Sequence, residues 1–166
     1  NAVLGRANKA LARRVTAIAT SFENVAGIDE SLKTKVRNTG NPVRDTVIDW
    51  SSRAYREPGP DGPFNVLVFG GSQGARFFSD AVPPALAALP EAIRRNLFVT
   101  QQAREEDLAR VEQAYAASGI RANAAAFFKT LPEEMAKASL VIGRAGASTV
   151  AELTVIGRPS ILVPLP

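Results

Sequence analysis

The sequence contains no histidine and no cysteine among its 166 residues. Without histidine the chain has no imidazole base, no Ser-His-Asp or Cys-His pair and no imidazole metal ligand. Without cysteine it has no disulfide, zinc thiolate site or iron–sulfur site. Any chemistry in this chain must therefore use carboxylates, hydroxyls, guanidinium groups and backbone amides.

Long apolar runs are also missing. No stretch of about 18 apolar residues occurs, so no membrane-spanning segment is predicted, and the first residues do not resemble a signal peptide. With 46% hydrophobic and 22% charged residues the composition is that of an ordinary globular chain. The default expectation is a cytoplasmic protein of one domain, or one and a fraction, that buries roughly 70% of its unfolded surface.

The net charge of +4 is local. Arg6, Lys9, Arg13 and Arg14 stand without an acid in the first 14 residues, and the rest of the chain is balanced. Apolar spacing over residues 2–14 predicts an amphipathic basic helix, which either contacts an anionic membrane surface or has a solvated face beside a core; we favour the second interpretation. A charge this localised does not indicate nucleic-acid binding.

Beyond residue 63 the pattern alternates regularly between strand and helix. Short strands at 17–20 and 35–37 come first, and Asn-Pro within 40–44 indicates a boundary. The later strands are predicted at 64–69, 97–100, 122–128, 140–142 and 161–163. The helices are predicted from about 75 with a restart at Pro83-Pro84, at 104–118 with a stop at Gly119, at 131–138 and at 147–156. This order implies an α/β fold whose parallel sheet has helices on both faces and ligands at the carboxyl ends of its strands.

Gly-Gly-Ser-Gln-Gly-Ala at 70–75 follows the first of these strands and opens a helix. Glycines let the backbone approach a ligand, and the amides of a first helical turn favour an anion such as phosphate, with Ser72 beside them. The run is not a P-loop, and a dinucleotide fingerprint with its later acid is missing, so NAD binding is disfavoured. A tight strand-to-helix turn without a ligand is the alternative.

Gly-Arg-Ala-Gly-Ala-Ser-Thr at 143–149 is a second loop of the same kind. Ser148 and Thr149 can donate to phosphate oxygens, and Glu152 can accept from two vicinal ribose hydroxyls. Thr149 and Glu152 also fit a capping box, as do Thr130 and Glu133, so the residues alone leave both roles of Glu152 open. Phe127 and Phe128 at the end of the third strand either edge a base pocket or belong to the core.

Together these runs resemble the MurG family of N-acetylglucosamine transferases of bacterial cell-wall synthesis. The resemblance covers essentially the whole chain. It rests on Thr-Gly-Asn-Pro-Val-Arg at 39–44, Gly-Gly-Ser-Gln-Gly-Ala-Arg at 70–76, Ala-x-Phe at 125–127, Arg-Ala-Gly-Ala-Ser-Thr-Val-Ala-Glu at 144–152, Gly-Arg-Pro at 157–159 and Leu-Val-Pro-Leu-Pro at 162–166. Asn1 and the Gly-x-x-Asn-Lys run at 5–9 also match. Departures occur at Thr100, at Thr130-Leu131 and at Gly143.

The resemblance implies a Rossmann-like sheet in a two-domain GT-B glycosyltransferase. Residues 1–43 would be the tail of an N-terminal, membrane-associated acceptor domain, and residues 44–166 a truncated C-terminal domain that binds UDP-N-acetylglucosamine (UDP-GlcNAc). The implied contacts are Ser72 and the turn Ala147, Ser148 and Thr149 with the diphosphate, Phe128 with uracil, Glu152 with ribose, Arg44 with the donor and Asn1 with the sugar. Val150 and Ala151 complete the implied UDP-GlcNAc site.

The implied activity is metal-independent, inverting transfer of N-acetylglucosamine from UDP-GlcNAc to lipid I, without a cofactor, on the cytoplasmic side of the inner membrane. The chain is interpreted as a piece of a longer protein, and it is expected to be inactive alone because the family's candidate base lies upstream of Asn1. A UDP-sugar epimerase of the same fold and a non-catalytic nucleotide-binding module are the alternative functions.

Overall fold

The computed structural model describes residues 2–164, with the backbone alone for 72–75. Its residues separate into two compact units, Asn1–Val43 and Arg44–Pro166. The smaller unit holds α1 (Arg6–Leu11), the 3₁₀ segment η1 (Glu30–Lys35) and two short parallel strands, β1 (Ile18–Thr20) and β2 (Val36–Asn38). The predicted helix over 2–14 is shorter than expected, because Val3 pairs with Ala26 in a β-bridge instead.

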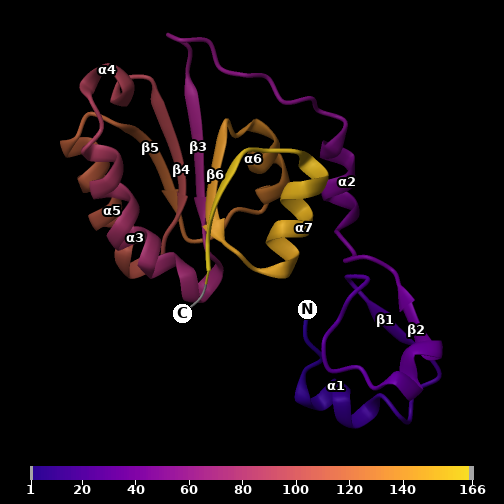
Figure 1. Cartoon of the computed structure of the whole chain (residues 1–166). Coiled ribbons are helices and arrows are strands. Elements are labelled where there is room, and N and C mark those ends of the chain that lie inside the picture. Colours follow the sequence, from indigo (N-terminus) through magenta and orange to yellow (C-terminus); the bar gives the residue numbers. More distant parts are fainter. Residues whose placement is uncertain (1, 165–166) are drawn as a thin grey trace. The chain divides into compact units, whose positions relative to one another are not determined.

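The larger unit is built on a five-stranded parallel sheet with the order β5-β4-β3-β6-β7 (Figure 1). Its strands are β3 (Phe64–Phe69), β4 (Leu97–Gln102), β5 (Arg121–Ala125), β6 (Leu140–Arg144) and β7 (Ser160–Val163). The chain runs outward from β3 to β5, returns to the middle and continues through β6 to β7. The prediction of a parallel α/β sheet is confirmed, and the switch point lies between β3 and β6, where doubly wound folds bind ligands.

Helices cover both faces of this sheet (Figure 1). The helices are α2 (Asp45–Ser51), α3 (Gly71–Ala87), α4 (Glu91–Arg94), α5 (Leu108–Ala117), α6 (Leu131–Lys137) and α7 (Ala147–Ile156), with a 3₁₀ segment η2 (Glu105–Asp107) before α5. One face carries α3 and α5, which pack on each other. The other carries α6 and α7, and α2 packs against these two helices. The predicted stop at Gly119 is confirmed.

The core lies between the sheet and the pair α3 and α5. Alternate residues of β3, Val66 and Val68, pack there with Val99 of β4, Phe78 of α3 and Tyr115 of α5. The near-continuous apolar run of β3 is typical of a strand that is covered on both faces. On the other side of the sheet, Met135 of α6 is fully buried. This packing fixes the strand ends from which the candidate site is built.

In the part of the chain that the structure describes, no helix is long and apolar enough to cross a membrane.

Candidate functional site

The first loop of the candidate site connects β3 to α3. The helix begins at Gly71, directly after Gly70, so most of the predicted loop 70–74 is the first turn of the helix. Gly71 has φ of +62°, a backbone conformation that residues with a side chain rarely adopt, and this permits the abrupt change from strand to helix. Ser72 therefore lies in the first helical turn, where backbone amides precede the intrahelical hydrogen bonds; its side chain lies outside the described residues.

The second loop connects β6 to α7, and here too the helix begins directly after a glycine. Gly146 is the N-cap of α7, and the first intrahelical bond runs from the Val150 amide to the Gly146 carbonyl over 2.9 Å. The amides of Ser148 and Thr149 thus lie in the first turn, and the Ser148 side chain is exposed. The helix dipole adds a partial positive charge at this end.

Neither predicted capping box is present. Thr149 is the third residue of α7 rather than its cap, because the helix begins three residues earlier than a cap at Thr149 requires. Thr130 does precede α6, but its side chain makes no capping bond, and Glu133 pairs with Lys137 over 2.8 Å instead. Glu152 is therefore not the capping partner of Thr149.

The two loops lie side by side because β3 and β6 are neighbours in the sheet. Phe69 and Gly143, near the ends of these strands, are paired in register. A Cβ at Gly143 would lie 3.2 Å from the Phe69 carbonyl oxygen, so the absence of a side chain allows this approach. The N-termini of α3 and α7 consequently open at one edge of the sheet, at the switch point.

Arg144 links the second loop to α3. Its guanidinium lies over the ring of Phe77, 4.5 Å from the centroid, and 5.5 Å from that of Phe78. It also donates to the Pro164 carbonyl over 2.8 Å. Sequence reasoning gave Arg144 no role. The adjacent aromatic residues at 77–78 were the available signal, but the contact joins elements that are far apart in sequence.

Glu152 and Arg44 are brought together, although 108 positions separate them. The Arg44 Nε donates to one carboxylate oxygen of Glu152 and Nη2 to the other, each over 2.9 Å. The Glu152 side chain is 11% exposed and that of Arg44 is 55% exposed. Two of the predicted site residues, both in the larger unit, thus form one hydrogen-bonded pair.

The other predicted residues are less closely grouped. Phe128 is half-buried in the connection after β5, an edge strand, whereas Phe127 is 72% exposed. Val150 is exposed and Ala151 half-buried in the second turn of α7. Asn1 lies outside the described residues. Among the described residues, no three acidic side chains gather closely enough to hold a metal ion.

Comparisons with known proteins match this architecture. A family model described as glycosyltransferase family 28 C-terminal domain matches residues 65–166. The Rhodospirillum centenum protein named UDP-N-acetylglucosamine--N-acetylmuramyl-(pentapeptide) pyrophosphoryl-undecaprenol N-acetylglucosamine transferase is 54% identical over 100% of this chain and 44% of its own length. The protein of the same name from Methylobacterium sp. (strain 4-46) is 55% identical over 100% of this chain and 45% of its own length.

A solved structure has the same fold. The crystal structure of Acinetobacter baumannii MurG matches with a TM-score of 0.73 at 29% sequence identity, over 100% of this chain and 44% of that chain. The chain thus spans less than half the length of the relatives it matches, and the predicted resemblance and fold class are confirmed. Because the family model covers most of the sequence, this chain belongs to glycosyltransferase family 28, whose C-terminal domain its residues 65–166 represent.

Proposed function

We propose that this chain contains the donor-binding domain of an inverting glycosyltransferase that moves N-acetylglucosamine from UDP-GlcNAc to lipid I, giving lipid II. One observation carries the proposal: the N-termini of α3 and α7 open next to each other at the switch point of the sheet. Two adjacent helix N-termini suit a diphosphate, which has anionic oxygens for both. The names of the relatives supply the sugar and the lipid-linked acceptor.

The roles of the individual residues follow from the resemblance to the family. Ser72 and the turn Ala147–Thr149 hold the diphosphate, and Glu152 accepts hydrogen bonds from the ribose hydroxyls. Phe128 holds the uracil through its backbone, and Asn1 contacts the sugar. Residues 44–166 form the donor domain, and residues 1–43 are the end of the acceptor domain, which works at the cytoplasmic face of the inner membrane.

In the reaction an acceptor hydroxyl attacks the anomeric carbon and gives its proton to a general base, while the bond to UDP breaks. Negative charge grows on the departing diphosphate as that bond lengthens, so the helix N-termini stabilise the transition state more than the ground state. One helix end contributes about 0.3–1 kcal/mol, and up to about 2 kcal/mol where it is partly buried. Two such ends would accelerate departure by up to about three orders of magnitude.

Calorimetry on the chain tests the donor site. We expect UDP to bind and NAD not to bind, because the chain lacks the acid that a dinucleotide fold places on the adenosine ribose. Glu152→Ala should weaken UDP about tenfold or more, the worth of one charge-assisted hydrogen bond, and should leave 2′,3′-dideoxy-UDP nearly unchanged. Equal losses for the two nucleotides would remove Glu152 from the ribose site, and no binding of UDP would overturn the proposal.

A further inference from the structure

Arg158 lies where three helices of the larger unit end. It follows Gly157, the C-cap of α7, and it is only 7% exposed. Its Nη1 donates to the carbonyls of Ile156 and Gly157 over 2.8 and 3.1 Å. Its Nε and Nη2 both donate to the Ala136 carbonyl of α6, over 3.1 and 2.8 Å, and Nη2 also donates to the Arg53 carbonyl just beyond α2, over 2.8 Å. One side chain thus joins the C-terminal ends of α2, α6 and α7.

These bonds use every N–H group of the guanidinium. Arginine has five such donors, and five bonds are formed. The last carbonyls of a helix have no partner within it, and a positive charge beside them is favourable. The Arg158 Cζ also lies over the ring of Tyr55, 5.6 Å from its centroid, and the Tyr55 hydroxyl donates to the Ser139 carbonyl over 3.2 Å. The guanidinium therefore cannot move without breaking several contacts at once.

The opposite ends of α6 and α7 face the proposed donor contacts. Helix α7 begins at the diphosphate loop after β6, and α6 begins three residues after Phe128, which is proposed to hold the uracil. Because α7 has ten residues it is about 15 Å long, which places Arg158 too far away to touch the nucleotide. Arg158 can act on the donor only through the positions of these helices.

Apolar packing alone would allow the helices to slide. Helix α2 packs on α6 and α7, which also pack on each other, and Val47, Met135 and Leu153 of these helices are buried. Apolar burial is non-directional, and packed helices can move past one another by small sliding shifts. Hydrogen bonds from one rigid, planar guanidinium instead set the distances between the helix ends. They hold α6 and α7 at one axial position relative to each other.

We propose that Arg158 is a positioning residue for the donor site, which fixes α6 against α7 and so holds the uracil contact and the diphosphate contact at the separation that one nucleotide needs. This rests on the proposed function. A ligand of two parts gains affinity over either part only when both parts can engage at once. The effect of Arg158 is therefore on the joined nucleotide rather than on its separate parts. Lysine could replace it only partly, because an ammonium group has three donors for five bonds.

The test measures dissociation constants for UDP, uridine and methyl diphosphate on the unaltered chain and its variants, by NMR titration for the two weaker ligands. Arg158→Leu should weaken UDP about tenfold, a part of the gain that joining two ligands brings, and change uridine and methyl diphosphate by less than about twofold. Arg158→Lys should weaken UDP by a smaller factor. Arg94→Leu is the matched control and should keep the full affinity for UDP. Arg94 donates to the Ser118 carbonyl at the end of α5, a helix that carries no proposed donor contact.

Thermal unfolding shows that each variant is folded at the temperature of the titrations, and if Arg158→Leu does not fold, Arg158→Lys decides the question. Full affinity for UDP in the folded variant would overturn the inference, while the proposed function stood. Equal losses for UDP and its two parts, or the same loss of UDP in Arg94→Leu, would overturn it too, because they would indicate general damage to the fold. If the unaltered chain did not bind UDP, the proposed function would fail first and the inference with it.

Discussion

At the scale of single residues, the core of the larger unit contains one fully buried polar pair of unusual composition. Tyr115 of α5 donates its hydroxyl to the Gln101 amide oxygen of β4, and both side chains are fully buried. Among the described residues, no atom accepts a hydrogen bond from the Gln101 Nε2. Burial raises the pKa of Tyr115 above its ordinary value, because the phenolate would be poorly solvated there.

This pair predicts a loss of stability in alkali that Tyr115→Phe should abolish. An unfolded tyrosine ionises near pH 10 and the folded one at higher pH, so above pH 10 the unfolded state loses the proton first. The free energy of unfolding should then fall by up to about 1.4 kcal/mol per pH unit. At pH 8 the variant should be less stable by about 1–3 kcal/mol, because the Gln101 oxygen loses its donor.

Urea unfolding between pH 8 and pH 11 measures both effects. The difference between the unaltered chain and Tyr115→Phe should be largest at pH 8 and should shrink as the pH rises above 10. Tyr55→Phe is the control, because Tyr55 is the only other tyrosine of the sequence and is partly exposed. A difference that stays constant over this range would show that the Tyr115 proton does not contribute.

The sequence predicted several site residues but could not resolve what each one does. Glycine, serine and threonine are all good helix caps, so Gly-Ala-Ser-Thr at 146–149 permits more than one helix start. The structure begins α7 after Gly146, which leaves Glu152 free of a capping role. Its pairing with Arg44 could not be predicted from spacing, because the contact depends on how α2 and α7 pack.

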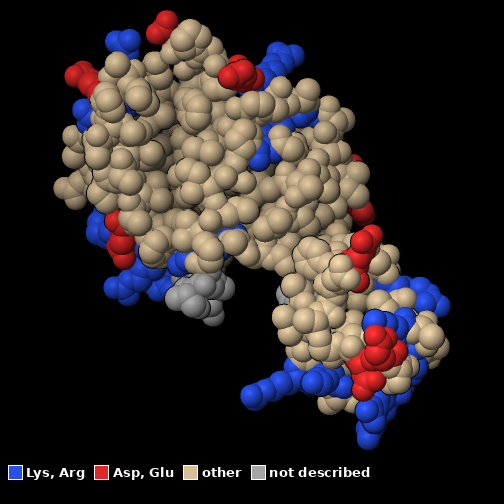
Figure 2. Space-filling model, in the orientation of Figure 1, with Lys and Arg blue, Asp and Glu red and all other residues tan. Residues whose placement is uncertain are grey.

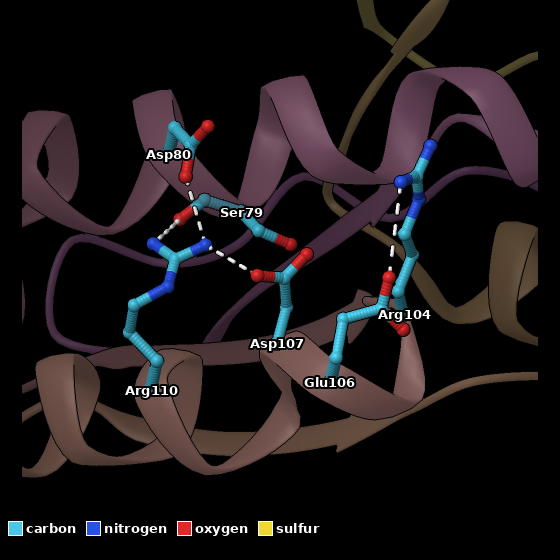
Figure 3. Close-up of polar contacts among 6 residues, drawn as sticks. All are labelled: Ser79, Asp80, Arg104, Glu106, Asp107 and Arg110. Carbon is cyan, nitrogen blue, oxygen red and sulfur yellow. Dashed lines mark hydrogen bonds and ion pairs between the residues drawn. The ribbon is translucent and has the colours of Figure 1, made fainter.

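At the scale of elements, α3 continues through two prolines that were predicted to interrupt it. Pro83 has no N–H for the Ser79 carbonyl, one turn earlier in the helix. Figure 3 shows the Arg110 guanidinium of α5 at that carbonyl, and its Nη1 donates to it over 3.3 Å. Arg110 also pairs with Asp80 over 2.8 Å and with Asp107 over 2.7 Å, and the Asp107 bond is the main cause of its raised pKa.

The support that Arg110 gives to Pro83 predicts a non-additive pair of substitutions. In Pro83→Ala the new N–H can bond the Ser79 carbonyl within the helix. Arg110→Ala should therefore lower the unfolding temperature less in the Pro83→Ala background than in the unaltered chain. Arg95→Ala, which removes an exposed arginine at the end of α4, should cost the same in both backgrounds. Equal losses for Arg110→Ala would mean that its ion pairs account for its whole effect.

Predictions of elements succeeded where a local pattern decides the structure. The apolar run of β3 and the glycine stop after α5 were predicted correctly, since both depend on neighbouring residues. In α3, the carbonyl left without a donor by Pro83 is bonded by an arginine 27 positions later in the sequence. Helix α1 starts late because Val3 pairs with Ala26 in a β-bridge. The residues next to Val3 in the sequence do not indicate this pairing, just as those next to Pro83 do not indicate Arg110.

At the scale of the whole molecule, charge is divided unevenly between the two units. Residues 1–43 hold seven Lys and Arg against three Asp and Glu, whereas residues 44–166 hold thirteen of each. In Figure 2, Lys and Arg side chains project along the outer edge of the smaller unit, beside a patch of Asp and Glu. The proposed donor site thus belongs to a unit without net charge, so in this proposal the helix N-termini rather than an overall positive field attract the diphosphate.

We expect the 166-residue chain to bind UDP-GlcNAc without transferring its sugar. The chain spans 44% of the length of the Rhodospirillum centenum relative and contains no histidine to accept the proton of the acceptor hydroxyl. Binding needs the loops after β3 and β6, which are present, whereas transfer also needs an acceptor site and a base. Incubation with labelled UDP-GlcNAc and lipid I should leave the lipid unlabelled, and the full-length Rhodospirillum centenum protein is the positive control. Labelled lipid II from this chain would show that its own carboxylates or a water molecule can serve as the base.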